Sequence, residues 1–162
     1  MKKIAAIFLS LTICLTLMAG CGSSEENKEL SEYKDSMESF FSTLEEIDTE
    51  INEIDPEADD SLESLYTEFD KLIETYSDLA ALTAPTEGAP ETFAYIDDLA
   101  DQAYDYMVQA DDYLNQSFDE SSYNETTLNA ALECYDRANK RVGYIIDLLH
   151  GELPQDETIT YN

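Results

Sequence analysis

The chain of 162 residues has no tryptophan, a single histidine and few basic residues. Eight lysines and arginines stand against 37 aspartates and glutamates, so the formal net charge is −29. Nucleic-acid binding depends on basic side chains that neutralise phosphates, and this composition excludes nucleic acid as a partner. One histidine, His150, cannot supply the two Glu-x-x-His pairs of a di-iron bundle or a histidine-rich zinc site. We therefore predict a protein without a catalytic site, a cofactor or a dedicated metal site.

Cysteine is also scarce, with only Cys14, Cys21 and Cys134 in the chain. These three do not form a Cys-x-x-Cys pair or the even, closely spaced set of a disulfide framework. Cys134 falls in a segment with helical periodicity, so we expect it to be a small, partly buried apolar residue. A reactive thiol at this position is the alternative.

The N-terminus has the order of features that is typical of a cleaved secretory signal. Lys2 and Lys3 precede an apolar run over 4–17, small residues follow, and a polar spacer begins after Cys21. The run is too short to span a membrane comfortably as a mature helix. Residues 18–21 resemble the lipobox of bacterial lipoproteins, with Met18 where that family usually has leucine and with Ala19 and Gly20 immediately before Cys21.

This resemblance implies that Cys21 is diacylglycerylated and that cleavage occurs immediately before it. Residues 1–20 are then the signal peptide and 21–27 a flexible tether on the extracytoplasmic face of the cell membrane. An ordinary cleaved signal with an incidental cysteine is the alternative. Loss of residues 1–20 removes Lys2 and Lys3 but no acid, which lowers the formal charge from −29 to −31. Such a polypeptide is expected to stand away from anionic headgroups.

Apolar residues recur at steps of three and four, which predicts α-helices over 28–54, 60–83, 90–117 and 124–150. The first seam is unbroken and runs through Leu30, Tyr33, Met37, Phe40, Leu44, Ile47, Ile51 and Ile54. Pro56 and the segment 84–90 interrupt the pattern, and Pro90 is expected to open the third helix. Gly151 is expected to cap the fourth helix, and 152–162 form a loose tail.

Short connections between four helices predict an all-α fold, an up-down-up-down antiparallel four-helix bundle over 28–151. The mature chain is long enough for one core and too short for two. We expect a monomer. An elongated helical hairpin that pairs with a second copy is the alternative architecture.

Two pairs of side chains are candidates for a contact surface. Tyr95 and Tyr104 fall outside the apolar seam of the third helix and are candidates for an exposed aromatic surface. Arg137 and Arg141 lie one turn apart, and we expect them to pair with carboxylates of a neighbouring helix. Binding of an anionic ligand is the alternative. The aspartates of the third helix predict a solvated acidic face, with weak Ca²⁺ binding as the alternative.

The overall pattern is similar to small lipoproteins of Firmicutes-type bacteria, which carry a lipobox followed by a helical bundle of unknown role. The resemblance is specific over residues 1–24 and transfers no active site. We expect a non-enzymatic envelope protein that is bound to the membrane by its lipid and that contacts another protein at the cell surface. A ligand- or cation-binding lipoprotein that assists a transporter is the alternative, and it predicts a cavity between the third and fourth helices.

Overall fold

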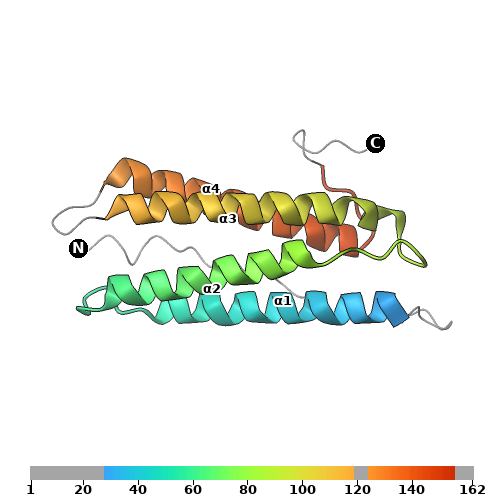
Figure 1. Cartoon of the computed structure of the whole chain (residues 1–162), viewed down its shortest axis with the longest axis horizontal. Coiled ribbons are helices and arrows are strands. Elements are labelled where there is room, and N and C mark those ends of the chain that lie inside the picture. Colours follow the sequence, from blue (N-terminus) through green and yellow to red (C-terminus); the bar gives the residue numbers. More distant parts are fainter. Residues whose placement is uncertain (1–27, 119–123, 156–162) are drawn as a thin grey trace.

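Helices joined by turns and irregular segments make up residues 28–118 and 124–155, which are the residues that the computed structural model describes. Its elements are α1 (Lys28–Glu53), α2 (Ser61–Ala81), the 3₁₀ helix η2 (Glu91–Tyr95), α3 (Ile96–Ser117) and α4 (Glu125–Leu149). The prediction of an all-α fold is confirmed for these residues. The four long helices lie lengthwise beside one another, with α1 next to α2 and α3 next to α4 (Figure 1). Cys21, the lipobox, the tether and residues 156–162 of the predicted tail lie outside the described residues.

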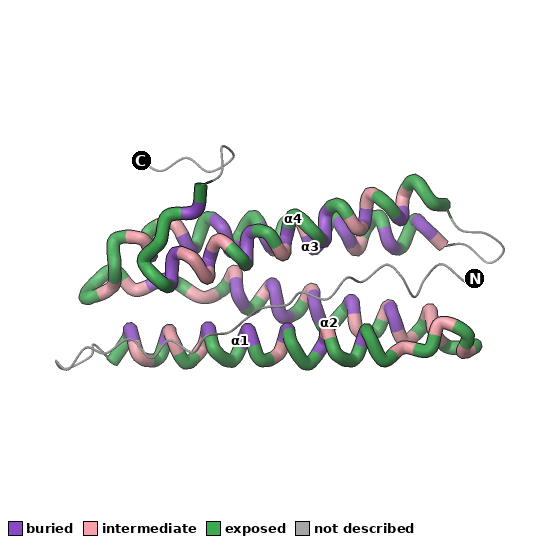
Figure 2. Tube along the Cα trace, turned by 180° about the vertical axis from the view of Figure 1, so that it is seen from behind, coloured by how far each residue is buried: buried purple, intermediate pink, exposed green. Residues whose placement is uncertain are grey.

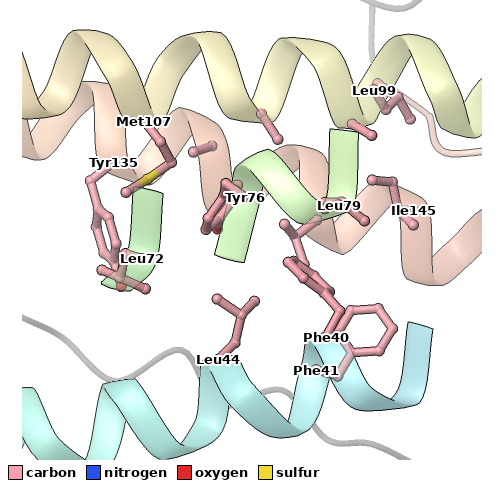
Figure 3. Close-up of a cluster of buried hydrophobic side chains, with 14 of the residues drawn as sticks. Phe40, Phe41, Leu44, Leu72, Tyr76, Leu79, Leu99, Met107, Tyr135 and Ile145 are labelled. Atoms are coloured by element: carbon pink, nitrogen blue, oxygen red, sulfur yellow. The ribbon is translucent and has the colours of Figure 1, made fainter. Parts of the chain in front are cut away.

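The inward faces of the helices form one hydrophobic core, seen as the buried positions in Figure 2. The predicted seam of α1 is buried except for Ile54, which follows the helix and is half-buried. Ala103 on α3 and Ala138 on α4 are fully buried, and small side chains on inward faces let helix backbones approach closely. Figure 3 shows how all four long helices contribute, through Phe40, Phe41, Leu44, Leu72, Tyr76, Leu79, Leu99, Met107, Tyr135 and Ile145.

A partly buried polar contact joins α2 to α4 beside this apolar core. The Tyr76 hydroxyl donates a hydrogen bond of 2.6 Å to Oδ1 of Asn139, which joins α2 to α4. Tyr76 is fully buried, and burial raises its pKa well above the usual value. Burial also raises the pKa of Tyr135, and a hydrogen bond with Asn139 opposes that rise. Buried polar groups need partners, so Asn139 fixes how α4 sits against α2.

The third helical segment begins differently from the prediction of an α-helix from residue 90. Residues Glu91–Tyr95 form η2, and the α-helix starts only at Ile96. Phe93 is buried and its ring centroid lies 5.9 Å from that of Tyr33 on α1. The Thr92 hydroxyl donates a 2.8 Å hydrogen bond to the carbonyl of Leu148 on α4. The tighter 3₁₀ turn accommodates both tertiary contacts, so packing overrides the local helix signal.

Both ends of α4 have specific capping interactions. The Asn124 side chain accepts hydrogen bonds from the backbone N–H groups of Thr126 and Thr127, so Asn124 is the N-cap and not a helical residue. At the other end Gly151 has φ +80°, and the amide of Glu152 donates to the carbonyl of Asp147 at 2.9 Å. A glycine with positive φ after the helix, followed by a backbone hydrogen bond back to the last turn, is a Schellman motif. This confirms the prediction that Gly151 caps the fourth helix.

Acidic side chains meet where α2 faces α3. Burial raises the pKa of Asp111, and repulsion from Asp70 on α2 raises it further. The Asn115 amide donates a 2.9 Å hydrogen bond to Oδ1 of Asp111 and opposes these effects. The native state therefore binds a proton at Asp111 more tightly than the unfolded state does.

We expect Asp111→Asn to raise the free energy of unfolding at pH 7, by less than about 1 kcal/mol because the carboxyl group is only partly buried and solvent screens its charge. In the wild type, the raised pKa of Asp111 makes the free energy of unfolding increase as pH falls through that pKa and decrease as pH rises through it. Asparagine does not titrate, so the variant lacks this contribution to the pH dependence. Urea unfolding followed by circular dichroism between pH 4 and 8 measures both effects. Asp105→Asn is the control, since it makes the same charge change at an exposed position of the same helix. Equal stabilisation by the two variants would show a general charge effect and contradict a local one.

Candidate functional site: an arginine–tyrosine cluster between α3 and α4

Arg141 lies against the side of α3 and is 7% exposed. Its guanidinium carbon is 5.2 Å from the centroid of the Tyr106 ring, and its Nε donates a 3.3 Å hydrogen bond to Oε1 of Gln102. Gln102 and Tyr106 are four residues apart on α3 and therefore lie on the same side of that helix. A guanidinium within about 6 Å of a tyrosine ring has a favourable cation–π interaction.

Arg137 reaches the same ring from one turn earlier on α4. Its guanidinium carbon is 5.7 Å from the Tyr106 centroid. It also pairs with the carboxylate of Glu133, and this hydrogen bond raises the pKa of Arg137. We call Gln102, Tyr106, Arg137 and Arg141 the arginine–tyrosine cluster. Two cations thus converge on one aromatic ring, and one of them has a carboxylate partner.

The expectation that both arginines pair with carboxylates of a neighbouring helix is wrong. Glu133, the partner of Arg137, belongs to α4 itself. Arg141 does cross to α3, but its contacts there are an amide oxygen and an aromatic ring. Lys28, Lys71 and Arg137 form ion pairs, whereas Arg141 has no carboxylate partner in the part of the chain that the structure describes.

Tyr95 and Tyr104, the tyrosines proposed as an exposed surface, are half-buried and pack against the core. Tyr95 belongs to η2, and Tyr104 is two residues before Tyr106, which places it on another side of α3. The tyrosine that contacts both arginines is Tyr106, which is not among the candidates that the sequence suggested. The available signal was the matched spacing of four residues in both pairs, Gln102 with Tyr106 and Arg137 with Arg141.

Cys134 lies one turn before the cluster on α4 and is buried. Burial raises the pKa of its thiol, and the nearby Arg137 opposes that rise. Because the thiolate is the nucleophile, a raised pKa favours the unreactive thiol. The expectation of a buried, small apolar residue is confirmed at this position.

Lys71 shows how another cation of the bundle is neutralised. Its Nζ is 2.7 Å from Oε2 of Glu50 on α1 and 2.9 Å from Oε2 of Glu68 on α2. The hydrogen bonds to these carboxylates raise the pKa of Lys71. Lys71 thus bridges two helices through charge, whereas Arg141 bridges two helices through neutral groups.

Within residues 28–118 and 124–155, no group of three or more histidine, cysteine, aspartate or glutamate side chains is placed to hold a metal ion. None of the helices described there is both long and apolar enough to cross a membrane. Comparisons with protein-family models, curated proteins and solved structures found no match to this chain.

Proposed function

We propose that the protein is a lipid-anchored envelope protein on the extracytoplasmic face of the cell membrane, where its bundle is a non-enzymatic contact surface for another protein. The observation that carries this proposal is the sequence Met18-Ala19-Gly20-Cys21 at the end of a short apolar run with a lysine-rich start. The helices described from Lys28 onward support it, because a rigid bundle next to a short tether presents its side faces to neighbours.

We also propose the up-down-up-down antiparallel arrangement for the bundle. The sequence colours of Figure 1 support it, since they run in opposite directions along consecutive helices. The connection of α1 to α2 is short, and short connections make consecutive helices antiparallel neighbours. In this arrangement the end of α4 lies at the same end of the bundle as the start of α1, close to the proposed anchor.

The anchor is tested by expressing the chain with its own N-terminus in a bacterium grown with an alkyne-tagged palmitate. We expect the tag on the peptide that begins at Cys21 and an intact mass that lacks residues 1–20. Without an acyl chain the sulfur of Cys21 would remain free for alkylation. A cleaved, membrane-free protein with a free thiol at that position would contradict the proposal and support an ordinary secretory signal.

The contact function is tested by native mass spectrometry on protein extracted gently from its own membranes after chemical crosslinking in living cells. A second polypeptide of defined mass supports the proposal. A bound small molecule or metal ion instead supports the alternative, a ligand- or cation-binding lipoprotein. The observation that favours this alternative is Arg141, whose charge has no carboxylate partner among the described residues.

A further inference from the structure

We propose that the arginine–tyrosine cluster binds one carboxylate group through the terminal nitrogens of Arg141. The proposal is independent of the lipid anchor, because it depends on contacts between α3 and α4 alone. It assigns a ligand chemistry to the flank of the bundle where these helices meet.

The first observation is an imbalance of charge at Arg141. The chain has 37 acidic residues, yet the guanidinium of Arg141, a residue that is only 7% exposed, has Gln102 and the Tyr106 ring as its partners. Removing a charge from water is costly unless an opposite charge compensates it. An amide oxygen and an aromatic ring compensate less than a carboxylate does. A ligand carboxylate would supply the missing partner.

The second observation is the availability of donors. A guanidinium has five N–H groups, and the Arg141 Nε–H is the one that bonds Gln102. Nη1 and Nη2 of Arg141 have no hydrogen-bond acceptor in the described part of the chain. Neither nitrogen is among the polar side-chain atoms there that are both buried from solvent and without a hydrogen-bond partner. These two nitrogens therefore reach solvent from a side chain that is otherwise buried. A fork of this kind matches the two oxygens of a carboxylate.

The third observation is the net charge of the cluster. Arg137 is neutralised by Glu133, so Arg141 leaves one uncompensated positive charge. One positive charge is balanced by a monoanion, and the formal charge of −29 on the whole chain repels anions of higher charge. These charges favour a carboxylate over a phosphate dianion. The cation–π contact with Tyr106 and the hydrogen bond to Gln102 restrain the Arg141 guanidinium before a ligand arrives.

The binding test is an NMR titration of the full chain in a neutral detergent, with ¹⁵N-labelled arginine and sodium chloride added to keep ionic strength constant. Acetate is expected to shift the Nε–Hε signal of Arg141, and the shift should saturate in the millimolar range. A Kd of about 1 mM corresponds to a binding free energy of about 4 kcal/mol. Phosphate at pH 7.5 is expected to bind at least threefold more weakly. A shift that is linear and equal for all arginines, or stronger binding of phosphate than of acetate, would overturn the proposal.

The same titration with N-acetyl-Gly-Glu-Gly-amide distinguishes two sources of the carboxylate. Tighter binding of this peptide than of acetate indicates a polypeptide partner, whereas equal or weaker binding indicates a small-molecule carboxylate.

Two variants test the role assigned to Arg141. Arg141→Lys, which keeps the charge but loses the fork, is expected to weaken acetate binding tenfold or more.

Glu133→Gln tests the charge argument without disturbing a buried residue, because Glu133 is exposed. Loss of this carboxylate frees Arg137 and is expected to strengthen acetate binding severalfold. Asp136→Asn is the matched control, an exposed acid on the same helix that has the same charge change. Equal gains from the two variants would show a general charge effect and contradict a site at Arg141.

Discussion

Replacing Cys21 by serine is expected to move the protein from the membrane fraction to the soluble fraction while its helical circular dichroism stays unchanged. Serine has no sulfur to alkylate, so the proposed diacylglycerol has no attachment point. None of the helices that the structure describes is long and apolar enough to cross a bilayer. For chains that lack residues 1–20 the loss from the membrane is expected to be nearly complete, because two acyl chains are what holds a lipoprotein stably.

Surface electrostatics strengthen this expectation. A basic residue near an anionic membrane contributes about 1 kcal/mol of attraction, and acidic residues reverse the sign. The processed chain has a formal charge of −31 after loss of Lys2 and Lys3. Released protein should thus stay released at low salt, where electrostatic attraction would otherwise be strongest.

The controls for this experiment are Cys14→Ser and Cys134→Ser, which alter the other two cysteines and should leave the protein in membranes. Intact mass is measured for every fraction, since an uncleaved signal can itself retain the variant. A Cys21→Ser chain that lacks residues 1–20 and still pellets with membranes after a carbonate wash would refute the anchor. If the variant keeps residues 1–20, its membrane binding does not test the anchor. The test is then labelling with alkyne-tagged palmitate, which must be absent from the Cys21→Ser chain.

The helices of this protein were predictable because local patterns determine them. In α1 the apolar residues keep steps of three and four, so one face is apolar and the rest is charged, which is stable only as a helix against a core. Gly151 is similar, because a positive φ at a helix end favours glycine whatever the rest of the fold does. These features depend on residues a few positions apart, and a single sequence contains that information.

Features that depend on tertiary contacts were not predictable in the same way. The start of the third segment is a 3₁₀ helix because Phe93 reaches Tyr33 on α1 and Thr92 reaches Leu148 on α4. Both partners are more than 50 residues away in the chain. The helical periodicity after Pro90 was real, and it carried no information about where the neighbouring helices lie.

The candidate site shows the same division. The positions of Arg137 and Arg141 on one side of α4 follow from their spacing. Their contact with Tyr106 depends on the rotation of α3 against α4, which the buried alanines of the two helices determine through close packing. A different rotation would bring another side of α3 to the arginines. The sequence alone therefore pointed to Tyr104, which lies outside the apolar seam, and not to Tyr106, which the structure places against the arginines.

The largest effect on stability is expected from Tyr76→Ala, which should lower the free energy of unfolding by about 3–5 kcal/mol. Tyr76 is fully buried, and its ring meets Phe40 of α1 at 5.9 Å between centroids while its hydroxyl bonds Asn139 of α4. Loss of this ring therefore removes contacts that hold three helices together. Urea unfolding at 25 °C, followed by circular dichroism, measures the change, and Tyr113→Phe at an exposed position is the control, with an expected effect within about 0.5 kcal/mol.

Tyr76→Phe separates the hydroxyl from the ring. We expect it to cost about 1–3 kcal/mol, because the ring still fills its place while Oδ1 of Asn139 loses its donor. In the double variant with Asn139→Ala the two losses should not add, and a coupling of about 1 kcal/mol is expected from the shared hydrogen bond. Additive losses would show that the two groups do not interact in solution.

Each unfolding curve is repeated at a tenfold higher protein concentration. An unfolding midpoint that rises with concentration indicates a dimer and supports the paired hairpin over a bundle that folds as a monomer.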